Sequence, residues 1–171
     1  MIKYLKEGKQ TEITPEILEI SSQIRGSGIE FIKNTFNWIP QHIKHTKDKE
    51  IKSKVFRKRT AKQIIDDGFT TGCTDIALVF VVLCRAKGIP TKYIEAIRKT
   101  SDGLSGHVFA ECYINNNWIC VDPTNMKVGD NSLYKGCDII GEGLDFSDIK
   151  TETIKDLKKK TKLFRKIDKN Y

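Results

Sequence analysis

The stretch Thr70–Pro90, TTGCTDIALVFVVLCRAKGIP, joins a polar turn to a long apolar run. Its valines would suit a strand, but the run is long for a strand. An acid near its start and basic residues near its end complement a helix dipole, and a glycine and a proline then stop the helix. We therefore predict a helix over Cys73–Lys87. Because this helix is apolar on every side, we expect it to be buried.

Cys73 stands at the polar end of this predicted helix, between Gly72 and Thr74. The unpaired N–H groups of a helix N-terminus stabilise a thiolate, and so does a neighbouring imidazolium. Cys73 is therefore a candidate nucleophile, and the same N–H groups could hold an oxyanion. The alternative is a small buried hydrophobic residue, as free cysteine often is. We interpret Asp75 as a stabiliser of the first helical turn.

Helical signals precede this segment and strand signals follow it. Thr14-Pro15-Glu16 begins a helix, Ile29–Ile43 repeats apolar residues at helical spacing with Pro40 as a kink or break, and Arg59–Asp67 forms a short helix. After Gly88 the apolar period changes to two. Helices followed by an antiparallel sheet predict an α+β domain with the Cys73 helix packed on the sheet. The predicted strands are TKYIEAI (91–97), HVFAECYI (107–114) and WICVD (118–122).

The remaining segments predict little regular structure. Residues 98–106 form a polar loop, and residues 123–148 are expected to be irregular. A weak helical pattern in a lysine-rich background follows. We predict one domain over residues 1–149, with its central motifs in 59–124, and a basic helical tail over 150–171.

His107 and Asp122 lie at opposite ends of the predicted hairpin. A two-residue turn at Asn115-Asn116 pairs residues whose numbers sum to 231. In this register, one face of the hairpin consists almost wholly of apolar side chains. Asp122 is then the diagonal neighbour of His107 on the other face, within side-chain reach. A one-residue slip would separate them. The register therefore predicts that a carboxylate orients an imidazole. The alternatives are a structural histidine for His107 and a turn-capping role for Asp122.

These motifs together resemble the transglutaminase-like superfamily, whose members have a papain-like thiol-enzyme core. The resemblance covers roughly residues 59–124 and implies a small single-domain member with a catalytic triad of Cys73, His107 and Asp122. It names no substrate. Trp38 is a candidate oxyanion donor, although its spacing favours a core position. The resembling motifs are Gly72-Cys73-Thr74-Asp75, Arg85-Ala86-Lys87-Gly88-Ile89-Pro90, Gly106-His107 with Glu111, and Trp118 with Asp122-Pro123-Thr124.

The expected chemistry is acyl transfer on an amide through a thioester. We favour hydrolysis, as a cysteine peptidase or amidase acting on a protein or peptide, because no second-substrate module is evident. One alternative is a transglutaminase, which transfers the acyl group of protein glutamine to an amine. The other is a catalytically inactive binding domain that uses its basic patches.

Composition and charge limit the classes of protein to which this chain can belong. The chain has 171 residues, of which 39% are hydrophobic and 30% charged, as in a soluble globular domain. It lacks a signal-like or membrane-spanning apolar stretch, so we expect a cytoplasmic location. The net charge of +8 comes mainly from residues 44–62 and 150–171. These segments carry no nucleic-acid-binding motif of interleaved aromatic and basic residues. We therefore interpret the segments as solvent-exposed surface and disfavour a binding site for nucleic acid or an acidic partner.

The five cysteines are an odd number without a CxxC pair, which indicates reduced thiols. Cys84, Cys112 and Cys120 lie in apolar patterns and are expected in the core. A zinc site of Cys73, Cys112, Cys120 and His107 is disfavoured, because the spacing lacks short chelating pairs. No cofactor is expected.

Overall fold

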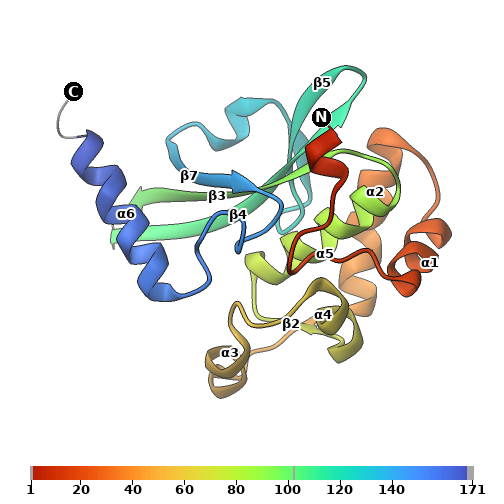
Figure 1. Ribbon diagram of the computed structural model, residues 1–171, viewed down its shortest axis with the longest axis horizontal. Helices are drawn as coiled ribbons and strands as arrows, with labels where there is room; N and C mark the ends of the chain where they lie inside the picture. The colour runs from red at the N-terminus through yellow and green to blue at the C-terminus, as the bar shows by residue number, and fades with distance from the viewer. Residues whose placement is uncertain (1, 102, 169–171) are drawn as a thin grey trace.

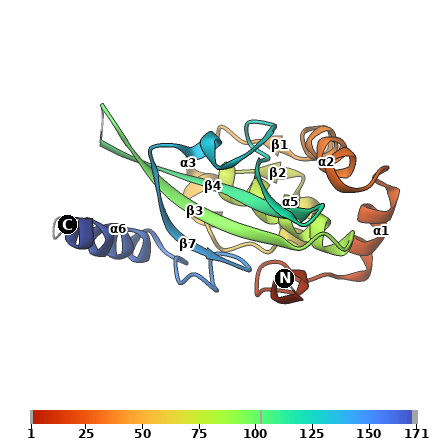
Figure 2. The same cartoon turned by 90° about the horizontal axis from the view of Figure 1, so that it is seen from above.

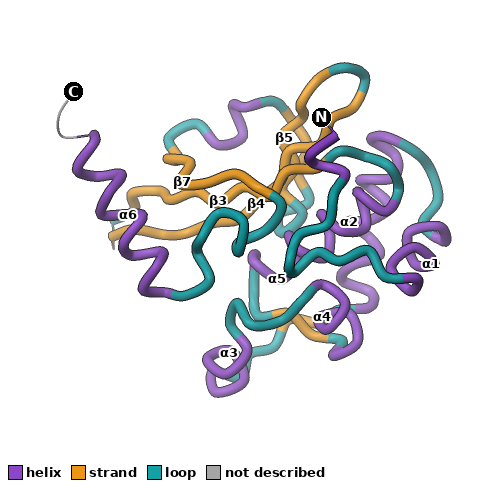
Figure 3. The backbone as a smooth tube through the Cα atoms, viewed as in Figure 1, coloured by secondary structure: helices purple, strands orange, loops and turns teal. Residues whose placement is uncertain are grey.

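The computed structural model describes residues 2–101 and 103–168, so residues 169–171 of the predicted tail lie outside the described part (Figure 1). Helices dominate the first half of the chain and strands the second (Figure 3). The helices are α1 (Pro15–Gln23), α2 (Gly28–His42), α3 (Lys49–Val55), α4 (Ala61–Asp67), α5 (Cys73–Ala86) and α6 (Ile154–Asp168), with 3-10 turns η1 (Ile2–Leu5) and η2 (Asn131–Tyr134).

The central helix α5 is buried along nearly its whole length, as its apolar run predicts, and every residue from Ala77 to Cys84 is fully buried. It packs against α1, α2 and α4 on one side and against one face of the sheet on the other. This burial makes α5 the centre of the hydrophobic core and fixes the position of its first residue, Cys73. The fold is therefore α+β, as predicted.

The main sheet is antiparallel, with strand order β6-β5-β4-β3-β7. The β4–β5 hairpin has the predicted register, with Ala110 opposite Val121 and Ile114 opposite Asn117. Its turn residues Asn115 and Asn116 both have positive φ, 50° and 65°, as a type I′ turn requires. The strands are β3 (Thr91–Thr100), β4 (Gly103–Ile114), β5 (Asn117–Asp122), β6 (Lys127–Gly129) and β7 (Cys137–Gly143).

Two expectations about irregular segments are wrong. Residues 98–106 are not a loop, because β3 and β4 continue as a paired ribbon to Thr100 and Gly103. Residues 123–148 include β6, η2 and β7, and β7 joins the free edge of β3 with a register shift between Glu95 and Ala96. A strand that is short and rich in glycine has a weak alternation of apolar and polar residues. Strand β7 is therefore defined by its pairing with the edge of β3.

Other local signals are met as expected. Thr14 caps α1 by accepting from the Ile17 N–H, and Gly68 closes α4 with φ 68°. Pro40 lies within α2 and does not break it, because the helix ends only two residues later. No sequence signal predicted α3 or the two-residue parallel pair of β1 (Lys44–His45) and β2 (Phe69–Thr70).

Helix α6 lies toward the same end of the molecule as the tip of the β3–β4 ribbon and contacts β7, whereas α1, α2 and α5 gather toward the other end (Figures 1 and 2). Thr151, just before α6, is fully buried. The division of the chain at residue 149 stays a prediction. Within the described residues, no helix combines the length and apolarity needed to cross a bilayer.

Candidate active site

The loop before Cys73 is held by a buried ion pair. Asp75 is 2% exposed and accepts from Arg59 Nη2 at 2.7 Å. The same carboxylate accepts from the backbone N–H and the hydroxyl of Thr71, each at 2.8 Å. Gly72 then turns the chain into α5 with φ 151°, a conformation that side chains disfavour. Asp75 is thus the predicted first-turn stabiliser, and it also anchors the loop that carries the thiol.

Cys73 is the first residue of α5 and is half-buried. The preceding residue, Gly72, offers no side chain to cap the helix. The N–H groups of the first turn therefore lack the usual capping acceptor and can attract an anion at this end of α5. The Cys73 side chain therefore lies beside these backbone donors.

His107 on β4 and Asp122 at the end of β5 are hydrogen-bonded, with 2.9 Å between Nε2 and Oδ2. The diagonal placement predicted from the register thus brings the two side chains together. The Cys73 side chain also lies close enough to the imidazole to raise its pKa. Because Nε2 is engaged by Asp122, Nδ1 is the ring nitrogen left for the sulfur. All three predicted site residues therefore meet at one place, from a helix and two strands.

Asp122 serves the turn and the imidazole with different oxygens. Its Oδ1 accepts from the backbone N–H groups of Thr124 and Asn125, at 3.0 and 3.1 Å. Asp122 thus also has the turn-capping role that was the alternative interpretation of this residue. Its Oδ2 accepts from His107 and, at 2.6 Å, from Nδ2 of Asn125. The hydroxyl of Tyr134 lies close enough to this carboxylate to lower its pKa. The carboxylate is consequently fixed in position before any substrate binds.

The charges of this pair reinforce each other. Hydrogen bonds to Asp122 and then to Cys73 raise the pKa of His107 from 6.5 to about 10. Burial alone would raise the pKa of the Asp122 carboxyl, but hydrogen bonds from His107, Tyr134 and Asn125 hold that pKa well below its usual range. At neutral pH the pair is therefore an imidazolium facing a carboxylate.

Tyr134 and Asn125 are site residues that the sequence reading did not identify. The Tyr134 ring, carried by η2, stacks on Phe109 with 3.6 Å between centroids and lies 6.0 Å from the His107 ring. Burial first, and then its hydrogen bond to Asp122, raise the pKa of Tyr134 well above its usual value. Asn125, three residues beyond Asp122, is a common partner in an Asx turn and could have been inferred. Tyr134 belongs to a segment read as irregular, so no local signal pointed to it.

The other candidate groups lie elsewhere. Trp38 packs against the core and stacks on the exposed His42, with 4.2 Å between ring centroids. Cys84 and Cys112 are buried on the α5 side of the sheet, whereas Cys120 is buried on the opposite face. The sheet therefore separates the thiols of the disfavoured zinc set. Among the described residues, no group of three or more His, Cys, Asp or Glu side chains could hold a metal ion.

Comparison with solved structures gives the same fold. A Cytophaga hutchinsonii protein, provisionally described as a cysteine protease, superposes with a TM-score of 0.68 at 21% identity, over 86% of this chain and 48% of its own. This chain thus spans about half the length of that protein. EGTA-treated LapG of Legionella pneumophila superposes with a TM-score of 0.52 at 13% identity, over 74% of this chain and 79% of its own.

Comparison of sequences gives the family. No curated protein matches this chain significantly. The sequence profile of the transglutaminase-like superfamily, however, matches residues 19–123, which include α5 and the β4–β5 hairpin. That match covers more than half of the chain and extends well beyond the motifs that suggested the resemblance. The chain therefore belongs to the transglutaminase-like superfamily, and its fold is of the papain-like kind.

Proposed function

We propose that the protein is a thiol hydrolase that cleaves an amide bond, as a cysteine peptidase or amidase, with Cys73 as nucleophile. The observation that carries the proposal is the position of one imidazole, that of His107, which is hydrogen-bonded to the Asp122 carboxylate and has its pKa raised by the nearby Cys73 side chain at the N-terminus of α5. Membership of a superfamily of papain-like enzymes supports the same chemistry.

The proposed acylation begins from a thiolate–imidazolium pair. The Cys73 sulfur attacks the amide carbonyl carbon, a C–S bond forms, and the carbonyl electrons move to oxygen, where N–H groups at the start of α5 stabilise the charge. The tetrahedral intermediate collapses and the C–N bond breaks. His107 gives its Nδ1 proton to the leaving amine, and a thioester remains on Cys73.

Deacylation reverses the proton movements. Neutral His107 takes a proton from a water molecule, and the oxygen of that water attacks the thioester carbon. The C–S bond then breaks. The acid product leaves, and the thiolate and the imidazolium are restored. Asp122 does not exchange a proton. Its role is to hold the ring with Nδ1 toward the sulfur and to stabilise the positive charge.

The test is digestion of a peptide mixture derived from a whole proteome, with new termini read by mass spectrometry. Wild type should create cleavage products that Cys73→Ala does not, and Cys84→Ala, which alters a buried thiol away from the site, should retain them. A parallel reaction with a fluorescent primary amine checks the fate of the acyl group. Amine incorporation into glutamine without cleavage would contradict hydrolysis, and a Cys73→Ala variant equal to wild type would contradict the thiol mechanism.

A further inference from the structure

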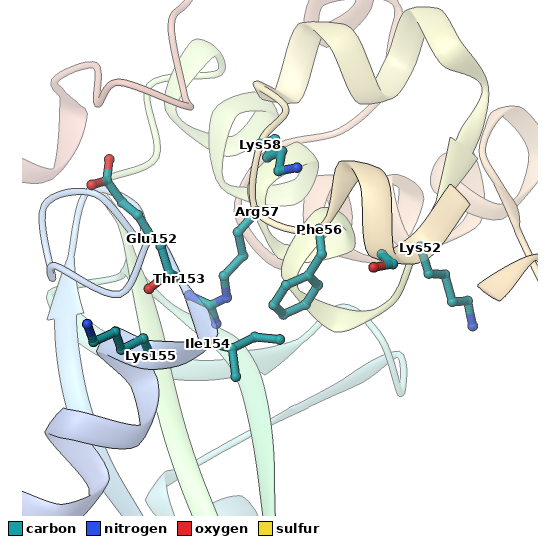
Figure 4. Close-up of a pocket in the computed structure, with 9 residues that line it drawn as sticks. Lys52, Phe56, Arg57, Lys58, Glu152, Thr153, Ile154 and Lys155 are labelled. Carbon is teal, nitrogen blue, oxygen red and sulfur yellow. The ribbon is translucent and has the colours of Figure 1, made fainter. Parts of the chain in front are cut away.

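A cavity of about 770 Å³ opens between the end of α3 and the start of α6 (Figure 4). The side chains of Phe56 and Ile154 lie near its centre in this view, and Ile154 is 57% exposed. An exposed isoleucine beside an aromatic ring is an apolar surface that an incoming side chain could cover. The lining residues are Lys52, Ser53, Phe56, Arg57, Lys58, Glu152, Thr153, Ile154 and Lys155.

The cavity has a rigid, buried base. The guanidinium of Arg57 pairs with Glu95 of β3 and donates to the carbonyl and hydroxyl of Thr151, at 2.6 and 3.0 Å. Thr151 in turn donates to Glu95 at 2.6 Å. These three residues are almost fully buried and tie together the end of α3, strand β3 and the start of α6. The positive charge of Arg57 is thereby matched by Glu95.

The surface around the cavity is strongly basic. Two neighbouring depressions share Ile154 with it and continue along α6. Glu152, an acid at the edge, is paired with Lys9 at 3.0 Å, and Asp156 caps α6 through Thr153. Within the described part of the chain, none of the lining lysines forms an ion pair. We call this surface the lysine groove; its basic residues are Lys52, Lys58, Lys155, Lys158, Lys159 and Lys162.

The lysine groove leads to the candidate active site. One of its depressions is lined by Ile154, Ile97 and Gly106, and Gly106 directly precedes His107. At its base, Glu95 lies two residues from Tyr93 on the same face of β3, about 7 Å along the strand. Burial and then Glu95 raise the pKa of the Tyr93 hydroxyl, which is fully buried. A chain bound along the depression that Gly106 lines would therefore reach the neighbourhood of His107.

From this arrangement we infer that the lysine groove binds an acidic polypeptide segment of the substrate, with an apolar side chain of that segment between Phe56 and Ile154. The inference rests on the proposed function for its connection to catalysis. Charge complementarity selects the acidic partner, because six lysines line this groove and Glu152 is the one acid among its described lining residues. The apolar centre selects one buried anchor residue within the acidic sequence.

A polypeptide fits these observations better than a nucleic acid does. A phosphate backbone would use the lysines but leave Phe56 and Ile154 uncovered, and Phe56 is the one aromatic side chain lining the groove within the described residues. An amide-cleaving thiol also requires an acyl substrate nearby, which a peptide supplies.

The test measures binding of a fluorescein-labelled peptide, Glu-Glu-Glu-Leu-Glu-Glu-Glu, by fluorescence anisotropy. It uses full-length Cys73→Ala, so that no turnover occurs. The triple variant Lys52→Glu, Lys58→Glu, Lys155→Glu should weaken binding by about tenfold or more at low salt, with a smaller loss near physiological salt. Ile154→Ser, or alanine in place of the peptide leucine, should each weaken it by about threefold to tenfold.

A matched control has the same change in net charge on exposed residues outside the groove: Lys6→Glu, Arg25→Glu, Lys33→Glu. It should change affinity less than about twofold at physiological salt. Equal losses in both triple variants, or wild-type affinity in the groove variant, would overturn the inference. So would a single-stranded oligonucleotide of equal charge that binds the wild-type groove more tightly than the peptide.

The two proposals fail separately. If the peptide binds the groove but Cys73 shows no activation by His107, the groove stands and the proposed hydrolase function fails. If Cys73 is activated but the peptide binding is independent of Lys52, Lys58, Lys155 and Ile154, the substrate class is wrong and the catalytic proposal stands.

Discussion

Nε2 of His107 lies 2.9 Å from Oδ2 of Asp122, across two strands joined by a two-residue turn. The bond depends on the hairpin register, since a shift of one residue would move one side chain to the other face. It also leaves Nδ1 for the sulfur at the start of α5. The relative positions of Cys73, His107 and Asp122 thus depend on a type I′ turn and one buried helix.

The first prediction concerns the protonation of His107. Its imidazole should titrate near pH 10, the raised pKa, instead of near 6.5. Asp122→Asn removes the negative charge but keeps the shape, so the pKa should return toward 6.5. The chemical shifts of the ring protons, followed by NMR against pH, measure both values. A titration near 6.5 in wild type would contradict the ion-paired geometry.

The same shift has a consequence for stability. The folded-state pKa of His107 lies above the unfolded-state value of about 6.5, so the folded state holds this proton more tightly. The stability it contributes is complete below about pH 6.5 and is lost as pH rises through about 10. The difference in Tm between wild type and His107→Gln should therefore shrink over that interval. A difference that stays constant from pH 6 to pH 10 would exclude this linkage.

The second prediction concerns Tyr134 as a positioning residue. Tyr134→Phe keeps the ring stacked on Phe109 but removes the hydroxyl that lowers the pKa of Asp122. Without this hydroxyl, Asp122 attracts the imidazolium proton more strongly, so the pKa of His107 should rise further, and stability should fall by about 1 kcal/mol. Tyr113→Phe, on the same sheet but packed on Trp118, is the matched control. A merely structural role would lower Tm without moving the His107 titration.

The third prediction concerns the anchor of the Cys73 loop. The side chains of Arg59 and Asp75 are 7% and 3% exposed, so Arg59→Ala would leave a buried carboxylate unpaired. The free energy of unfolding should fall by about 3–5 kcal/mol, as measured by urea denaturation. Lys62→Ala breaks the exposed pair with Asp66 and should leave the midpoint nearly unchanged. Equal effects of the two variants would show that the buried pair does not hold the loop.

The sequence predicted those parts of the fold that local chemistry determines. The apolar run with its charged ends specified α5, and the alternation around Asn115-Asn116 specified the hairpin and so the meeting of His107 with Asp122. The α+β class followed from the order of these signals. These features share a property: each is encoded by residues that are close in sequence.

The missed features depend on contacts between distant segments. Strand β7 is recognisable only as the partner of β3, and Tyr134 reaches Asp122 only because η2 crosses the sheet face that carries Phe109. The pair of Arg57 with Glu95 joins residues 38 positions apart. Periodicity over a window of residues does not register such contacts.

The measurement that tests the central claim most directly is the pH dependence of iodoacetamide alkylation, read at each cysteine by mass spectrometry, for wild type and His107→Ala. Alkylation reports the thiolate, so a preformed thiolate–imidazolium pair predicts rapid modification of Cys73 below pH 7, with the four other cysteines slow. His107→Ala should remove that advantage. If Cys73 reacts no faster than an ordinary thiol below pH 7, or equally fast without His107, the proposed catalytic assignment is contradicted.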